Sequence, residues 1–159
     1  IKECVAEFEV PHELIAFELT ESAFVSDNMQ LYNLAKLLQE NHFNVMMDDF
    51  GSGYSSLNSL REIPVDVLKI DLKFLPPSSD DRRGNVILHS VVEMANRLGL
   101  EVIVEGVETI EQAEFLLSIG CRNAQGFYFY RPMPVSEYER CLEEEPKEIS
   151  VRRQEEQSK

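Results

Sequence analysis

Two hydrophobic periodicities alternate along the chain. Short runs of mainly apolar residues are each followed by a stretch with apolar positions three or four residues apart, the spacing of one helix face. The runs that predict strands are 13–20, 43–49, 65–71, 101–105 and 123–130. The stretches that predict helices are 1–8, 28–40, 55–63, 85–98, a helix opened by Thr109, and a last one from Ser136 to about Glu144. Strands that alternate with helices favour parallel pairing and an α/β fold.

Local signals mark the ends of these elements. Gly99 and Gly120 follow predicted helices at the position where a C-terminal glycine belongs. Segments 109–112 and 136–139 read as capping boxes, Ser26 or Asp27 as a helix cap, and 75–84 as a surface loop. A doubly wound sheet and a (β/α)8 barrel both remain open. A barrel needs eight units and about 250 residues, so this chain would supply five of them.

Composition places the chain among ordinary globular proteins. Of its 159 residues, 43% are hydrophobic and 28% charged, and no apolar run approaches the roughly 20 residues that span a bilayer. We therefore expect no membrane contact by this segment. Three cysteines without metal-type spacing are typical of reduced thiols, which predicts a cytoplasmic protein. Residues 1–142 are predicted to form the domain and the charged segment 143–159 a disordered tail.

The charge balance restricts the ligands. The chain has 15 basic and 29 acidic residues, a formal net charge of −14. A duplex nucleic-acid binder normally shows a basic face, so that class is excluded. An acidic protein can still bind a phosphorylated ligand when metal ions supply the positive charge.

Polar side chains stand at the C-terminal end of every predicted strand. They are Glu18 and Glu21, Asp48 and Asp49, Lys69 and Asp71, Glu105 and Glu108, and Gln125. Active sites of α/β proteins lie at the carboxyl ends of the strands. Because a charge is costly to bury without compensation, we expect these groups to converge on one site rather than to lie in the core.

Converging carboxylates need a counter-charge, and Mg²⁺ or Mn²⁺ would supply it. Adjacent acids such as Asp48 and Asp49 could bridge two ions, which would clamp an in-line phosphoryl displacement, with Lys69 on a phosphate or the attacking water. Each motif alone also has a bland interpretation as a turn, a cap or a surface residue. An unrelated barrel with Lys69 as a Schiff-base nucleophile competes with the metal hypothesis, but neighbouring carboxylates favour the charged amine.

Five segments resemble the EAL-domain family of bacterial cyclic di-GMP phosphodiesterases. They are FELTES (17–22), DDFGSGYSSL (48–57), PVDVLKID (64–71), EGVET (105–109) and AQGFYFYRPMP (124–134). The resemblance implies a partial (β/α)8 barrel, with this chain supplying strands four to eight. It also implies metal-dependent hydrolysis of cyclic di-GMP to the linear dinucleotide, with Mg²⁺ or Mn²⁺, as two ions, as the cofactor.

The resemblance also implies roles for individual residues. The metal ligands it implies are Glu18, Asp48, Asp49 and Glu105, with Glu105 also counted as catalytic. Lys69 would orient the water or a phosphate, Asp71 would help to activate the water, and Gln125 would be an active-site amide. The residues implied to couple a loop and a homodimer to metal binding are Glu21, Phe50, Gly51, Ser52, Gly53 and Tyr54.

The motif that names the family, and an asparagine ligand, belong to strands upstream of this sequence. Since the chain also begins with Ile1 rather than methionine, we expect it to be a piece of a longer protein, with a sensory or GGDEF domain as a possible partner upstream. The three upstream strands would be missing, so we expect the chain alone to be a poor enzyme. The alternative function is a catalytically inert cyclic di-GMP sensor or protein-interaction scaffold of the same fold.

Overall fold

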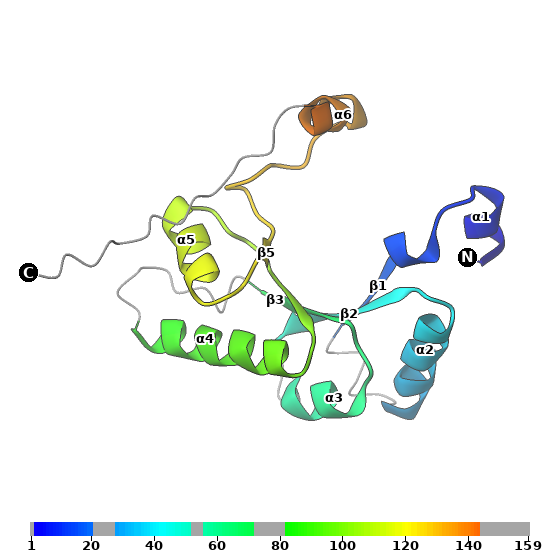
Figure 1. Ribbon diagram of the computed structural model, residues 1–159, viewed down its shortest axis with the longest axis horizontal. Helices are drawn as coiled ribbons and strands as arrows, with labels where there is room; N and C mark the ends of the chain where they lie inside the picture. The colour runs from blue at the N-terminus through cyan, green and yellow to red at the C-terminus, as the bar shows by residue number, and fades with distance from the viewer. Residues whose placement is uncertain (1, 21–27, 52–55, 72–81, 144–159) are drawn as a thin grey trace, which may run out of the picture.

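Figure 1 shows the computed structural model, which describes residues 2–20, 28–51, 56–71 and 82–143. Its elements are α1 (Lys2–Glu7), a 3-10 turn η1 (His12–Leu14), β1 (Ala16–Thr20), α2 (Asn28–Glu40), β2 (Asn44–Phe50), α3 (Ser56–Glu62), β3 (Val67–Ile70), α4 (Arg82–Arg97), β4 (Glu101–Val104), α5 (Ile110–Ser118), β5 (Asn123–Ala124) and α6 (Val135–Glu143). Within this described part, no helix is both long and apolar enough to cross a membrane.

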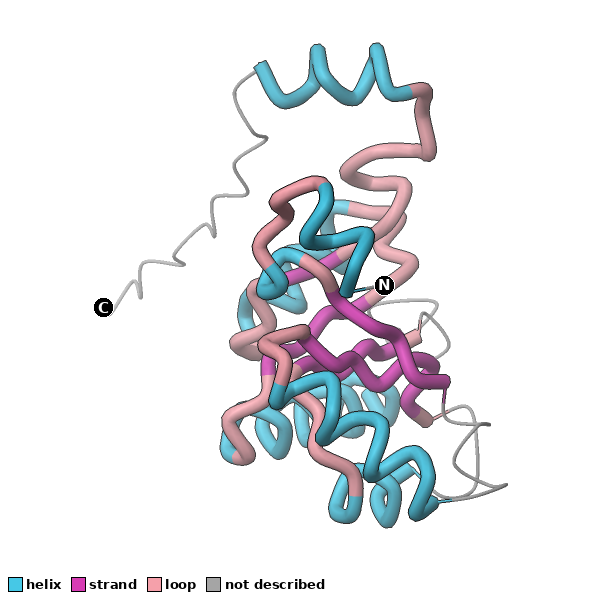
Figure 2. The backbone as a smooth tube through the Cα atoms, turned by 90° about the vertical axis from the view of Figure 1, so that its right-hand side faces the viewer, coloured by secondary structure: helices cyan, strands magenta, loops and turns pink. Residues whose placement is uncertain are grey.

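The five strands form one parallel sheet whose spatial order, β1-β2-β3-β4-β5, is the order of the chain. A doubly wound sheet reverses its strand order at a switch point, and the described strands show no reversal. Helices α2, α3 and α4 lie along one side of the sheet in Figure 1, and Figure 2 shows the strands beside that helical layer. The winding is that of a stretch of (β/α)8 barrel, which confirms the partial-barrel prediction.

The core lies between the sheet and the helices. Strand β3 is central and buried at every position, with Leu68 and Ile70 fully buried. Leu88 and Val92, on α4, belong to the same buried cluster. A parallel strand covered in this way reads as a nearly continuous apolar run, so the charged Lys69 within β3 stands out.

Asp66, the residue before β3, ties the N-terminal ends of three strands together through its side chain and its backbone. The side chain of Asp66 accepts hydrogen bonds from Gln39 Nε2 and from the backbone N–H of Val45, both at 2.8 Å. Its own N–H donates to the Val45 carbonyl, and its carbonyl accepts from the N–H of Glu101. Asp66 thereby joins α2, β2 and β4 at the edge of the sheet opposite the predicted site.

Several sequence-based boundaries hold and others are wrong. Thr109 and Gln112 form the predicted capping box, and Gly99 and Gly120 have φ angles of 76° and 84°. The first strand starts at Ala16 rather than at 13, because the preceding residues form η1. Helix α4 starts at Arg82, so the last three residues of the predicted loop 75–84 are helical. The rest of that loop, and the cap at Ser26 or Asp27, lie outside the described residues.

The two corrections near the C-terminus have clear causes. The fifth strand is only Asn123–Ala124, since the chain then turns and the N–H groups of Tyr128 and Phe129 donate to the carbonyls of Val107 and Gly126. Ser136 is not a helix cap. Helix α6 already begins at Val135, and the carbonyl of Pro134 accepts from the N–H groups of Glu137 and Tyr138.

We predict that Asp66→Ala lowers the free energy of unfolding by about 2–3 kcal/mol, because it leaves the Val45 N–H without its charged acceptor. Urea denaturation followed by circular dichroism measures the change. Asp66→Asn keeps one acceptor oxygen and is expected to lose less. An alanine variant as stable as the parent chain would show that this network contributes nothing to the sheet.

Candidate active site

Lys69 on β3 lies among three carboxylates. Its Nζ atom is 2.7 Å from Glu18 Oε1, 2.9 Å from Glu105 Oε1 and 3.1 Å from Asp48 Oδ1. The three acids come from β1, from β2 and from the residue that follows β4. The lysine side chain is 9% exposed, whereas Glu18 is 50% exposed. We call these four residues the Lys69 cluster.

The two-residue period of β-strands explains why these four side chains meet. On β2, β3 and β4 the residue just before each of Asp48, Lys69 and Glu105 is buried. Neighbouring side chains in a strand point to opposite faces, so the three polar residues point to the sheet face away from the apolar core. In the parallel register Thr20 pairs with Asp48 and Lys69 pairs with Ile103, so Glu18 and Glu105 each lie two residues from one of these partners and on the same face of the sheet.

The end of β2 departs from regular strand geometry. The pairing of β2 with β3 shifts register between Met47 and Phe50, and Asp49 has a φ of 58°. Aspartate is one of the few residues that tolerates this left-handed conformation. Among the described contacts, Asp48 reaches Lys69 and Asp49 does not. Asp49 is half-buried beside the cluster rather than within it.

The turns after β4 and β5 are bonded to each other. The N–H of Glu105 donates to the Ile70 carbonyl, and the N–H of Val107 donates to the Gln125 carbonyl. A Cβ atom on Gly126 would lie 2.1 Å from the Val107 carbonyl oxygen, so only glycine fits there. The backbone of Gln125 is therefore fixed in the turn after β5, while its side chain is exposed and, among the described contacts, does not touch the Lys69 cluster.

Electrostatics keeps Lys69 charged. Burial lowers the pKa of its ammonium, but the contacts with Glu105, Glu18 and Asp48 more than offset this and raise the pKa well above its usual range. A protonated amine cannot attack a carbonyl, so the Schiff-base hypothesis loses its nucleophile. One ammonium facing three carboxylates also leaves the cluster with surplus negative charge.

The cluster fits a hard cation by its chemistry. Asp48 Oδ1 is buried and, although it is close to Lys69 Nζ, it has no hydrogen bond of acceptable geometry within the described structure. Carboxylate oxygens with surplus negative charge are the ligands that Mg²⁺ and Mn²⁺ prefer. Among the residues described, no three acids, histidines or cysteines surround a common point at ligand distance. The ammonium of Lys69 lies at the centre of the acids instead.

The other predicted site residues have different positions. Asp71 follows β3 at the same edge and is half-buried. Phe50 is the last residue of β2 and is buried in the core, and Gly51 has a φ of 92°. The predicted residues Glu21, Ser52, Gly53 and Tyr54 lie outside the described part of the chain.

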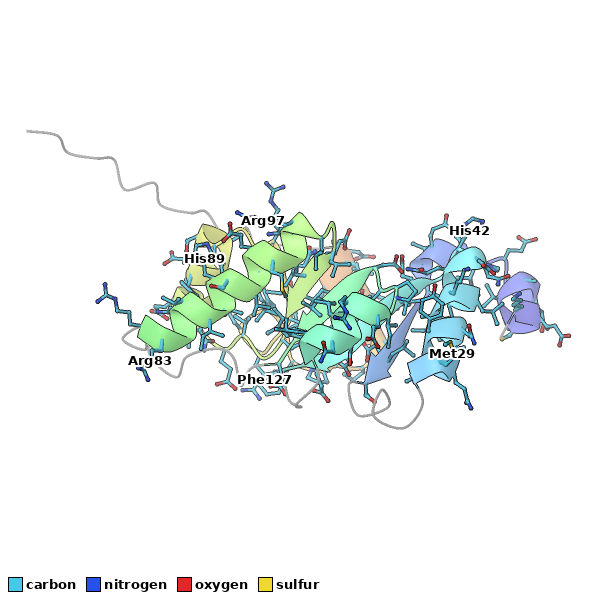
Figure 3. All side chains as sticks on the ribbon, turned by 90° about the horizontal axis from the view of Figure 1, so that it is seen from below. Met29, His42, Arg83, His89, Arg97 and Phe127 are labelled. Atoms are coloured by element: carbon cyan, nitrogen blue, oxygen red, sulfur yellow. The ribbon has the colours of Figure 1, made fainter. Side chains whose placement is uncertain are left out.

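The three histidines lie away from the cluster. His42 and His89 are exposed on the outside of the molecule, as Figure 3 shows. The ring of His12 stacks on Phe43 with centroids 4.4 Å apart, and its Nδ1 is 2.7 Å from the Asn41 carbonyl oxygen. The candidate site is therefore built from carboxylates and an amine.

The fold and the position of the site define the class of protein: an α/β barrel with its polar site at the carboxyl ends of the strands. The model of the EAL domain family matches residues 1–132. The chain belongs to the EAL domain family.

Individual relatives and solved structures agree with this assignment. The chain is 40% identical over 135 residues to the cyclic di-GMP phosphodiesterase RocR of Pseudomonas aeruginosa, covering 84% of this chain and 34% of RocR. The EAL domain of Mycobacterium smegmatis DcpA superposes with a TM-score of 0.83 and 36% identity, covering 89% of this chain and 63% of that one. A Klebsiella pneumoniae BlrP1 complex with manganese and cyclic di-GMP superposes with a TM-score of 0.77 and 32% sequence identity. The match covers 82% of this chain and 33% of the BlrP1 chain.

We predict that Gly126→Ala lowers the free energy of unfolding by about 3 kcal/mol, because the new methyl group would overlap the Val107 backbone. Chemical denaturation measures the loss. Gly99→Ala is the matched control, since its methyl group would meet no atom within 4 Å. Only its left-handed backbone is then strained, at about 1 kcal/mol. Equal losses in the two variants would contradict the close approach of the two turns.

Proposed function

We propose that the protein containing this chain hydrolyses one phosphodiester bond of cyclic di-GMP to give linear pGpG, with Mg²⁺ or Mn²⁺ as cofactor. Membership of the EAL domain family supports the proposal, as does the likeness to RocR, which is named a cyclic di-GMP phosphodiesterase. The BlrP1 structure, which contains manganese and cyclic di-GMP, supports both the cofactor and the ligand class. The chain spans 34% of RocR and 33% of the BlrP1 chain, so the activity is proposed for the whole protein.

The observation that carries the proposal is the Lys69 cluster itself. A phosphodiester is an anion, and an acidic protein needs a positive centre to hold it beside carboxylates. Lys69 places an ammonium at the carboxyl ends of the strands, surrounded by acids with surplus negative charge. Divalent ions bound there would activate a water and neutralise the oxygens of the transition state.

Each side chain then has a proposed task. Glu18, Asp48 and Glu105 would hold the ions, with Asp49 completing the set for a second ion. Lys69 would donate hydrogen bonds to a phosphate oxygen or to the attacking water, and so orient it. The half-buried Asp71 lies at the same edge and would accept the proton of that water. Gln125, exposed on a fixed backbone, would donate to the substrate from the rim.

The remaining proposals concern assembly and context. The segment from Phe50 to Tyr54, together with Glu21, would couple a homodimer interface to the metal site. Phe50 is the last residue of β2, two positions after Asp48, so a change of the segment would act on the site through the strand. We also propose that residues 1–142 belong to the barrel domain, that the protein works in the cytoplasm, and that a sensory or GGDEF domain precedes this segment.

We predict that the protein containing this chain converts cyclic di-GMP to pGpG in the presence of Mn²⁺ and that Asp48→Ala lowers the rate by roughly 100-fold or more, because metal stabilisation of a transition state is worth several kcal/mol. Chromatography of the nucleotides measures the conversion. Glu93→Ala removes an acid that pairs with Arg97 on the exposed side of α4, and it is expected to keep the parent rate.

Two comparisons in this assay can contradict the proposed activity: one between proteins of different length, and one between the parent protein and Asp48→Ala. The 159-residue chain is assayed beside a longer protein that includes the upstream residues, and we expect turnover mainly from the longer one. Cyclic di-GMP that binds both proteins without turnover by either would favour the inert sensor of the same fold. Turnover that is unchanged in Asp48→Ala would remove the Lys69 cluster from the mechanism.

A further inference from the structure

The ammonium of Lys69 is surrounded by carboxylates inside the protein. An ammonium has three N–H donors, and three carboxylates from three separate chain segments lie within 3.1 Å of its nitrogen. A lysine on the surface does not require three carboxylate partners, because water accepts the hydrogen bonds of a solvated ammonium. Lys69 is instead 9% exposed and sits on the central strand of the sheet.

Removal of this charge would leave an unfavourable group of acids. Glu18, Asp48 and Glu105 stand on neighbouring strands or directly after one, and all three lie within 3.1 Å of the same ammonium nitrogen. Like charges held at a few ångströms repel, and a buried ion that loses its partner is strongly destabilising. Asp48 is the most enclosed of the three acids, at 18% exposed, and has the least access to water as a substitute.

From this arrangement we infer that Lys69 is a positioning residue that holds the three carboxylates together in the metal-free protein, as a built-in counter-charge that a divalent cation can partly replace. The part that concerns the cation rests on the proposed function. Glu18 is half-exposed and so marks the side from which a cation can reach the acids. The ammonium is on a long flexible stem, which lets it shift toward a substrate phosphate once another cation balances the acids.

The test compares thermal unfolding of four forms of the 159-residue chain: the parent, Lys69→Met, Glu105→Gln and the double variant. In excess chelator we expect Lys69→Met to lower the Tm by roughly 5–10 °C. Adding Glu105→Gln removes one of the repelling charges, so the double variant is expected to be more stable than Lys69→Met. Lys36→Met, on the exposed surface of α2, is the matched control and is expected to leave the Tm unchanged.

A double variant that is no more stable than Lys69→Met would overturn the inference, because a purely structural lysine would give additive losses. If Lys69→Met alone does not fold, the same two variants are still compared. We then expect the double variant to show the thermal unfolding transition that Lys69→Met lacks. If neither variant folds, the Lys69 ammonium of the parent chain is observed by nitrogen-resolved NMR and assigned with Lys69→Arg. Fast exchange of its protons with water would then overturn the inference, and slow exchange would support it.

A second arm repeats the melts with Mn²⁺ in place of chelator. We expect Mn²⁺ to raise the Tm of Lys69→Met by at least about twice as much as that of the parent, because the cation fills the place of the missing charge. An equal or smaller shift would overturn the exchange of cation and ammonium. If Mn²⁺ stabilises neither chain, the exchange of cation and ammonium is overturned, while recovery in the chelator arm still supports the positioning role of Lys69. The metal part of the proposed function is tested separately, by turnover of the longer protein.

Discussion

A parallel sheet brings the carboxyl ends of its strands to one edge, and the acids at that edge need a counter-charge. Glu18, Asp48 and Glu105 come from separate βα units, yet all three lie within 3.1 Å of one nitrogen atom. The ammonium of Lys69 on the central strand is the positive charge that the described structure offers them. The site therefore depends on an ion-pair cluster at least as much as on the apolar core behind it.

The two ends of the sheet are held together by different interactions. At the N-terminal end, Asp66 bonds mainly to backbone groups, so the strand starts are fixed by hydrogen bonds that no ligand disturbs. At the C-terminal end, side chains bond to one another around Lys69, and the inferred exchange with a cation would take place there. A fixed end and an exchangeable end suit a binding site on a rigid sheet.

Sequence patterns predicted much of this arrangement because the relevant signals are local or periodic. Alternation of strands and helices predicted the α/β class. The polar residues at the strand ends included the four of the Lys69 cluster, but Gln125, expected in the same site, does not touch them among the described contacts. The pattern placed Lys69 near the acids, and the structure brings it into contact with three of them. The family resemblance then distinguished the barrel from a doubly wound sheet, a choice that the periodicity alone left open.

Features that depend on long-range contacts were harder to predict. Asp66 gave no signal, because an acid near the start of a predicted strand looks like an ordinary surface residue until Gln39 and Val45 are placed beside it. The fifth strand was predicted too long. The aromatic run after Ala124 has the composition of a strand, but the backbone turns there and the N–H of Tyr128 donates to the Val107 carbonyl. Ser136 matched a capping motif, but the helix begins one residue earlier, and the carbonyl of Pro134 accepts from the N–H groups of Glu137 and Tyr138.

The strand order also has a consequence for how the chain folds. Each strand pairs with the one that precedes it in the chain, so the sheet can grow by adding one βα unit at a time as the polypeptide leaves the ribosome. The Lys69 cluster forms in a different order. Lys69 contacts Glu18, which is 51 positions away in the sequence, and Glu105 joins the cluster only after β4 has docked. The scaffold can therefore form progressively, whereas the chemistry-bearing cluster is completed late in folding.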